Sequence, residues 1–151
     1  MRIAIDDPMQ PDVHALLEEH LHQMKQFSPP GSVHALDAHR LTTPDITFWS
    51  ARDGDTLLAC GALRQLNDEH GEIKSMRTPL ALRRRGAGRA LLDHIVREAR
   101  QRGYKRLSLE TGSSDDFGSA RHLYESAGFR YCDPFGDYLP DPHSVCMTLW
   151  L

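Results

Sequence analysis

The chain has 151 residues, 40% of them hydrophobic and 26% charged, and a formal net charge of -3 at pH 7. This composition excludes a disordered chain, and the mild acidity argues against a nucleic-acid binder, whose affinity rests on many phosphate contacts. The chain has no apolar run that approaches the length of a membrane span, and its three cysteines show no paired spacing. Residues 1–7 are polar and acidic, so we expect no secretory signal. We therefore expect a cytoplasmic protein with neither a nucleic-acid nor a membrane partner.

The first half of the chain combines short strands with one clear helix. The pattern predicts a strand over 2–6, a helix over 12–26, a short helix or a plain connector over 33–41, and two strands over 46–52 and 56–66. The turn signal at 53–55 indicates a hairpin between the last two strands. On the first helix, His20 and His22 lie two residues apart and share no helix face, which favours solvated histidines over a metal site. No metal is expected in this protein.

The second half begins with a strand over 72–78, so residues 46–78 are predicted to form an antiparallel meander. The remaining pattern predicts helices over 88–102 and 119–127 and strands over 106–111, 129–132 and 145–150. A strand, a helix and a strand in succession imply a parallel pair joined by a right-handed crossover. No repeat or linker interrupts the chain, and we expect one domain over 1–151 with an α+β fold.

An Arg- and Gly-rich stretch joins the meander to the next predicted helix. Its arginines and glycines are Arg83, Arg84, Arg85, Gly86, Gly88 and Arg89. A helix start offers unpaired N–H groups and favours negative charge, and glycine lets a phosphate approach the backbone. The stretch lacks the Lys and Ser or Thr of a P-loop and the third glycine of a dinucleotide fingerprint. It predicts a pyrophosphate cradle, with a solvated basic helix start as the alternative.

Arg83-Arg84-Arg85-Gly86-Ala87-Gly88 resembles the signature of the GNAT superfamily of N-acetyltransferases, which reads Gln or Arg, two variable residues, Gly, one variable residue, and Gly or Ala. Glu110-Thr-Gly and the stretch from Ala120 to Phe129 are similar to the second half of that family's acetyl-CoA site. Stretches at 32–37, 46–49, 72–78 and 131–138 resemble a bacterial subgroup of the same family.

The resemblance implies a fold and a reaction. The fold is a mixed, mostly antiparallel sheet of about seven strands, with a parallel pair splayed at the cofactor site and helices on both faces in αβα layers. The reaction is transfer of an acetyl group from acetyl-CoA to a primary amine of a small molecule or peptide. Amine attack is direct, assisted by a general base and by protonation of the leaving thiolate.

The resemblance also assigns contacts to the cosubstrate acetyl-CoA. Backbone N–H groups of 84–89 would bind the pyrophosphate, and exposed backbone near Met76 and Thr78 would pair with the pantetheine arm and polarise the thioester carbonyl. Family members often carry a cofactor-binding Asn where this chain has Phe117, for which Ser119 or Ser114 could substitute. The expected contacts are Met76, Arg77, Thr78, Arg83, Arg84, Arg85, Gly86, Ala87, Gly88, Arg89 and Ser119.

Two catalytic groups follow from the same resemblance. Glu72 lies four residues before Met76, the spacing at which some family members place a general base. An ordinary surface residue is the alternative for Glu72, and Glu110 is the rival base. Tyr124 matches the family tyrosine that protonates the leaving thiolate, and the alternative is a core tyrosine whose hydroxyl finds a hydrogen-bond partner.

The acceptor pocket is expected to use acidic and polar side chains that suit a cationic amine. They are His34, Asp37, Glu110, Asp137 and Tyr138. Homodimers are common in the family, so a homodimer is a further expectation. Two other functions stay open at the level of sequence. One is an acyl-CoA sensor that binds without chemistry, and the other is a nucleotide or nucleic-acid binder, against which the net charge argues.

Overall fold

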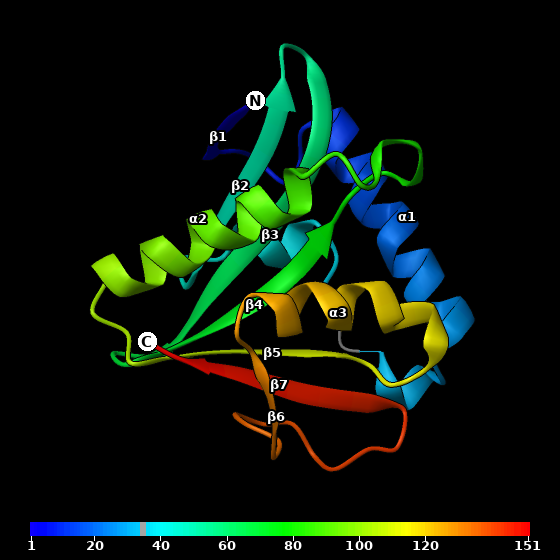
Figure 1. The fold of residues 1–151 in the computed structure, drawn as a ribbon. Coiled ribbons are helices and arrows are strands. Elements are labelled where there is room, and N and C mark those ends of the chain that lie inside the picture. Colours follow the sequence, from blue (N-terminus) through cyan, green and yellow to red (C-terminus); the bar gives the residue numbers. More distant parts are fainter. Residues whose placement is uncertain (34–35) are drawn as a thin grey trace.

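The computed structural model describes residues 1–33 and 36–151 and contains one mixed sheet (Figure 1). Its seven strands lie in the order β1-β2-β3-β4-β5-β7-β6. The strands are β1 (Arg2–Ile5), β2 (Ile46–Asp53), β3 (Thr56–Asn67), β4 (His70–Arg77), β5 (Arg106–Gly112), β6 (Arg130–Cys132) and β7 (Ser144–Trp150). The helices are α1 (Pro11–Phe27), α2 (Ala87–Gln101) and α3 (Gly118–Ser126), with short 3-10 turns at Pro30–Ser32, His39–Thr42, Leu80–Leu82 and Asp115–Phe117.

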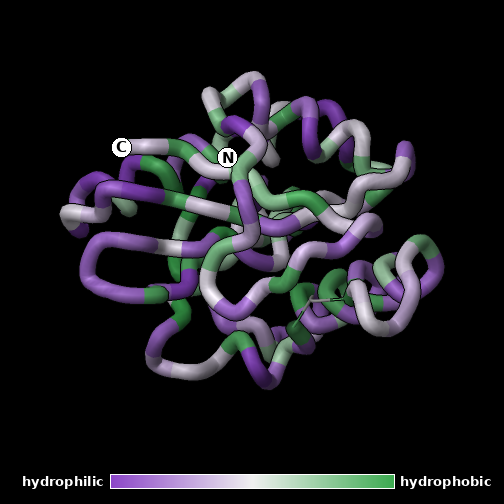
Figure 2. The backbone as a smooth tube through the Cα atoms, turned by 90° about the horizontal axis from the view of Figure 1, so that it is seen from below, coloured by the Kyte–Doolittle hydropathy of each residue, from purple (hydrophilic) through white to green (hydrophobic). Residues whose placement is uncertain are grey.

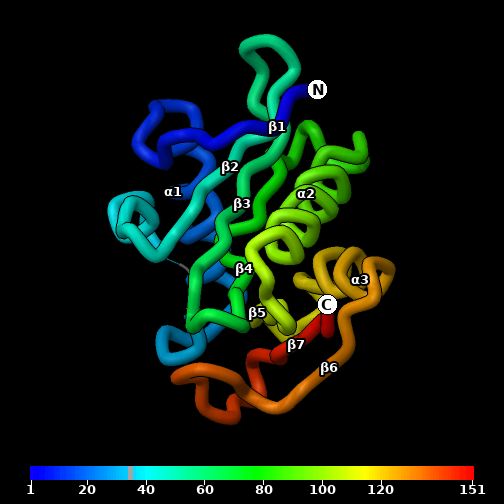
Figure 3. Tube along the Cα trace, turned by 90° about the vertical axis from the view of Figure 1, so that its left-hand side faces the viewer, coloured from blue at the N-terminus to red at the C-terminus, as the bar shows by residue number. Residues whose placement is uncertain are grey.

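Helices cover both faces of the sheet, as the αβα expectation requires. Figure 3 shows α1 on one side of the strands and α2 and α3 on the other. The larger core lies under α2 and α3, and its buried members include Leu63, Ile73, Leu91, Leu92, Ile95, Leu107, Leu109, Phe129 and Met147. A second core lies under α1 and joins Val13, Leu16 and Leu17 to Phe48, Cys60 and Ala62.

The two cores follow from side-chain alternation along the strands. On β3, Cys60 and Ala62 belong to the α1 core whereas Leu63 belongs to the α2 core, because successive strand residues point to opposite faces. Hydrophobic and hydrophilic residues accordingly alternate along much of the chain instead of separating into long blocks (Figure 2). Each face of the sheet therefore presents apolar side chains to the helices that cover it.

The strand pairing confirms the predicted meander and crossover. The pairs β2–β3 and β3–β4 are antiparallel, and β4 pairs with β5 in parallel across the α2 connection. The predicted helix 88–102 is α2, and Gly103 ends it with a φ of 81° in the left-handed region. The sheet class, the parallel pair and the positions of all three helices were thus predictable from the sequence.

The helix expected over 33–41 is not formed by the described residues. Residues 36 and 37 are irregular, and only His39–Thr42 makes a 3-10 turn. The Asp37 carboxylate accepts a hydrogen bond from the Arg40 N–H at 2.9 Å, a local bond that favours a tight turn over a continuing helix. No helix in the described residues combines the length and apolarity needed to cross a membrane.

Candidate active site

The start of α2 forms an open backbone cradle. Gly86 is the residue before the helix and has a φ of 82°, and Arg84 also has a positive φ of 65°. No side chain caps the helix N-terminus, so its first N–H groups stay available. A Cβ built on Gly86 would meet nothing within 4 Å, which leaves open space beside those donors. Successive N–H groups in such a turn suit an anion, so the backbone fits the predicted pyrophosphate.

Side chains around the cradle divide into exposed and buried groups. Arg83, Arg84 and Arg85 are exposed, whereas Ala87 is buried in the core at the first turn of α2. Arg89 is exposed and reaches Asp93 at 3.1 Å and Ser126 at 3.0 Å. The predicted cofactor contact of Arg89 is therefore available from its backbone, while its side chain ties α2 to α3.

The end of β4 lies directly beside this helix start. A Cβ on Gly88 would lie 3.4 Å from Thr78 Oγ1, so the two predicted cofactor contacts are neighbours. The Arg77 side chain points the other way, and it is 8% exposed and bonded to Glu19 and Gln23 of α1. Only its backbone is free to serve the predicted cofactor contact.

Strands β4 and β5 separate before either strand ends. Their last register pair is Ile73 with Leu109, whereas β4 continues to Arg77 and β5 to Gly112. Figure 1 shows the two strands diverging beyond that point. A register shift between β3 and β4 accompanies the separation, and Ser75 within it has a φ of 57°. This region is called the splay below, and it leaves β4 backbone open to an added extended segment.

Glu72 lies in a buried polar cluster just before the splay. Its Oε2 accepts a 2.6 Å hydrogen bond from the Tyr138 hydroxyl and lies 3.3 Å from Lys74 Nζ. The Lys74 ammonium also donates to the Tyr138 hydroxyl oxygen at 3.1 Å. Glu72 is 2% exposed, which rules out the alternative of an ordinary surface residue. Burial, followed by the negative charge of Glu72, raises the pKa of Tyr138.

Glu110 is the first β5 residue beyond the last pair with β4. Burial raises the pKa of its carboxyl to about 7, the Lys74 charge acts in the opposite direction, and the charges of Glu72 and Asp141 raise it further. Ser32 and Asp141 join the two loops next to this site through a 2.5 Å hydrogen bond. Two carboxylates with different environments therefore face the splay, an arrangement that suits general acid–base chemistry.

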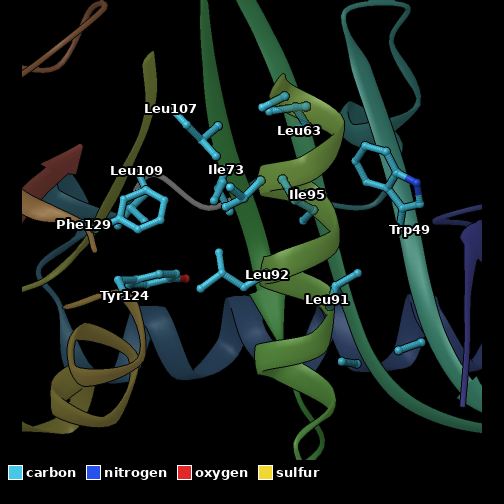
Figure 4. Close-up of a cluster of buried hydrophobic side chains, with 14 of the residues drawn as sticks. Trp49, Leu63, Ile73, Leu91, Leu92, Ile95, Leu107, Leu109, Tyr124 and Phe129 are labelled. Atoms are coloured by element: carbon cyan, nitrogen blue, oxygen red, sulfur yellow. The ribbon is translucent and has the colours of Figure 1, made fainter. Parts of the chain in front are cut away.

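Tyr124 of α3 lies under the splay in the larger core. Figure 4 shows its ring beside Phe129 and its hydroxyl oxygen directed toward Leu92. The residue is 7% exposed, and its hydroxyl forms no hydrogen bond within the described residues. Burial, with a further contribution from the Glu110 charge, raises the pKa of Tyr124, so the phenol stays protonated at neutral pH. A protonated phenol is the form that can donate to a thiolate.

Phe117 has a packing role at the start of α3. A Cβ on Gly112 would lie 2.0 Å from the Phe117 ring, and Phe117 meets Phe27 of α1 edge-on at 6.3 Å. The side chain thus holds the end of β5 against α1. Ser119, the predicted substitute contact, is exposed on the first turn of α3, whereas the Ser114 hydroxyl is bonded to Asp116 at 3.3 Å.

Not all of the predicted acceptor residues come together. Tyr138 and Glu110 lie with Glu72, whereas Asp37 is exposed and no contact joins it to Glu72 in the described part of the chain. His34 lies outside the described residues. Sequence reasoning missed Lys74 and Asp141, although strand alternation places Lys74 on the Glu72 side of β4.

The expectation of solvated histidines on α1 was wrong for His20. His20 is 7% exposed, while His22 is exposed. Burial and the nearby Arg77 charge lower the pKa of His20 to about 4. No group of three or more potential ligands is placed to hold a metal ion among residues 1–33 and 36–151.

Comparison with known proteins agrees with this geometry. Residues 13–129 match the model of the acetyltransferase (GNAT) family. The chain is 56% identical over 148 residues to YsnE, an uncharacterised N-acetyltransferase of Bacillus subtilis, and the match covers 98% of each chain. The structure of a Klebsiella pneumoniae protein assigned as an acyl-CoA N-acyltransferase superposes with a TM-score of 0.81 at 26% identity. The match covers 97% of this chain and 94% of the Klebsiella chain.

A GNAT acetyltransferase from Elizabethkingia anophelis, solved with acetyl-CoA bound, shares the fold with a TM-score of 0.70 at 20% identity, over 99% of this chain and 97% of its own. The chain belongs to the GNAT acetyltransferase family. Its class is that of the acetyl-CoA-dependent acyltransferases.

Proposed function

We propose that this protein transfers the acetyl group of acetyl-CoA to a primary amine of a small molecule or peptide. The observation that carries the proposal is the open, left-handed turn at Arg84 and Gly86, set beside the splay of β4 and β5. The turn offers donors for the pyrophosphate, and the free side of β4 offers backbone groups for the pantetheine arm. The acetyl-CoA bound to the Elizabethkingia anophelis relative supports this choice of cosubstrate.

The chemistry proposed at the splay needs three protein groups. A backbone N–H near Met76 polarises the thioester carbonyl, one of the carboxylates Glu72 and Glu110 accepts the ammonium proton, and Tyr124 protonates the leaving thiolate. The carboxylates also suit a cationic acceptor. Direct attack of the amine needs no covalent enzyme intermediate, and no cysteine is assigned to it, since burial raises the pKa of Cys60 to about 12.

Two measurements test the proposal. Acetyl-CoA at about 100 times its dissociation constant should stabilise the protein by about 2.7 kcal/mol in a thermal-shift assay. A panel of primary amines should then release free CoA thiol in a colorimetric assay. No stabilisation by acetyl-CoA would refute the cosubstrate, and stabilisation without turnover on any amine would favour an acyl-CoA sensor instead.

A further inference from the structure

We infer that Glu110 accepts the proton of the acceptor ammonium, whereas Glu72 is a positioning residue that holds Lys74 and Tyr138 at the site. The inference rests on the proposed acetyl transfer and assigns its proton route. It follows from three features of the two carboxylates: their hydrogen bonds, their places relative to the splay and the charges around them.

Glu72 is already occupied by donors from this chain. The Tyr138 hydroxyl lies 2.6 Å from its Oε2, the Lys74 ammonium lies 3.3 Å away, and the residue is 2% exposed. Both donors fix the orientation of the carboxylate. They bind the same oxygen, Oε2, and the near-complete burial of the residue restricts the access of an incoming ammonium to the rest of the carboxylate. This arrangement suits a carboxylate that orients its neighbours better than one that exchanges protons with a substrate.

Glu110 has the opposite surroundings. It follows Leu109, the last β5 residue paired with β4, and therefore lies where the strands separate. Its carboxylate receives no hydrogen bond from the described residues, and the residue is only partly buried. A carboxylate with free acceptor positions at the mouth of the splay is available to a ligand ammonium.

The titratable groups that face Glu110 come from every element around it. The charged groups are Glu72 and Lys74 of β4 and Asp141 of the connection between β6 and β7. The titratable but neutral groups are Tyr138 of the same connection, Cys146 of β7 and Tyr124 of α3, whose pKa values are raised. Burial is the largest influence on Glu110, and Lys74 opposes it while Glu72 and Asp141 reinforce it, giving a pKa of about 7. A base with this pKa is ionised in part at neutral pH and is strong enough to accept an ammonium proton through water.

The proton balance of the reaction closes with Glu110 and Tyr124. The ammonium gives one proton to Glu110, and the freed nitrogen pair forms a bond to the thioester carbonyl carbon while the C=O π pair moves onto oxygen; this pair restores the double bond when the adduct collapses. As that adduct collapses, the carbon–sulfur bond breaks with its electron pair on sulfur, and the Tyr124 hydroxyl protonates the thiolate. The adduct nitrogen loses its second proton to solvent, and solvent exchange restores both side chains. One ammonium and one acetyl-CoA yield one amide, one CoA thiol and one proton.

Glu110 and Tyr124 are also coupled through their charges. Ionised Glu110 contributes to the raised pKa of Tyr124, so protonation of Glu110 makes Tyr124 a stronger acid. That change falls after the ammonium has been deprotonated, when the thiolate needs a proton. The base thus prepares the acid for the second half of the reaction.

The test compares Glu110→Gln with Glu72→Gln in full-length protein. Wild-type kcat/KM should rise with pH through about 7, because Glu110 must be unprotonated to act. Glu110→Gln should lower kcat/KM by about 100-fold or more. It should also lose the rise of kcat/KM around pH 7, called the limb below, so that kcat/KM rises only near the pKa of the amine itself. Glu110→Asp, which keeps a carboxylate one methylene shorter, should retain the limb at a reduced rate.

Glu72→Gln should keep the limb but move its midpoint to lower pH, because the Glu72 charge raises the pKa of Glu110. It should raise KM for the amine more than it lowers kcat, since it disturbs positioning. The thermal shift with acetyl-CoA should persist in both variants. NMR of isotope-labelled glutamate carboxyls gives a readout independent of activity. One carboxyl should titrate near pH 7 in the wild type, vanish in Glu110→Gln and persist with a lower midpoint in Glu72→Gln.

Each contrary result overturns the inference. Loss of the limb in Glu72→Gln with retention in Glu110→Gln would assign the base to Glu72. A carboxyl that still titrates near pH 7 in Glu110→Gln would show that this titration does not belong to Glu110, and so contradict the assignment of Glu110 as the base. Failure of the wild type to bind acetyl-CoA, or to acetylate any amine, would instead refute the proposed function itself and the inference with it.

Discussion

The Tyr138 hydroxyl donates a 2.6 Å hydrogen bond to Oε2 of Glu72, a residue 66 positions earlier in the chain. This bond and the contact of Phe135 with His70 of β4, with ring centroids 5.6 Å apart, hold the connection between β6 and β7 against β4. The loop proposed to line the acceptor pocket is thereby joined to β4. A substitution in the β6–β7 connection should therefore affect the position of Glu72 on β4.

Removing the Tyr138 hydroxyl should weaken the attachment of the β6–β7 connection to β4 but keep the Glu72–Lys74 pair. Tyr138→Phe deletes the bond to Glu72 but leaves Lys74 as its partner, so we expect a loss of about 1 kcal/mol in the free energy of unfolding and a higher KM for the amine. Chemical denaturation and steady-state kinetics measure the two effects. Tyr131→Phe is the matched control, because its hydroxyl bonds the exposed Glu125 at 2.7 Å. An unchanged KM in Tyr138→Phe would argue against its place in the acceptor pocket.

Gly86→Asp should abolish acetyl-CoA binding, because it adds bulk and negative charge where the pyrophosphate is proposed to lie. Gly54→Asp provides the control, since Gly54 also has a positive φ, of 57°, and open space, but lies in the turn between β2 and β3. Each variant should lose about 1 kcal/mol of stability from left-handed backbone strain. Only Gly86→Asp should lose the thermal shift with acetyl-CoA. Gly88→Asp should behave like Gly86→Asp, and unchanged affinity in both would refute the cradle.

Tyr124→Phe should lower kcat while acetyl-CoA affinity is kept, because the phenol is proposed to protonate the thiolate and its ring packing is retained. Release of CoA thiol and a binding isotherm separate the two quantities. Tyr104→Phe is a close control: Tyr104 is 6% exposed, and its buried hydroxyl has no partner in the described residues. That variant should be neutral or slightly more stable. Equal kcat in Tyr124→Phe and wild type would assign Tyr124 to packing alone.

The elements of this fold were readable because local pattern and tertiary burial agree. The helical spacing of apolar residues predicted α2, and the order of elements predicted the parallel pair. The cluster around Glu72 could not be predicted from the sequence, because it depends on a long-range contact. The connection between β6 and β7 brings Tyr138 to Glu72 of β4. Lys74 carried a signal that was missed, since it lies two residues after Glu72 and strand residues two apart share a face.

His20 carried a similar signal. Its position continues the apolar stripe of Val13, Leu16 and Leu17 on α1, so helical spacing alone indicated burial. The polar character of histidine led to the opposite expectation, although burial of a neutral imidazole is compatible with a core position. Its position next to Arg77 depends on how α1 packs on β4, which the sequence does not specify.

The burial of His20 makes a prediction about stability in acid. Its pKa falls from 6.5 to about 4 on folding, so between these values the unfolded chain binds a proton that the native protein does not. The contribution of His20 to stability is therefore complete above pH 6.5 and is lost as pH falls toward 4, by up to about 3 kcal/mol. Urea unfolding across this range should give a free energy that declines with acidification. His20→Leu should flatten the decline, whereas His22→Leu, at an exposed position of the same helix, should keep it. A decline of equal slope in His20→Leu would show that other groups cause it.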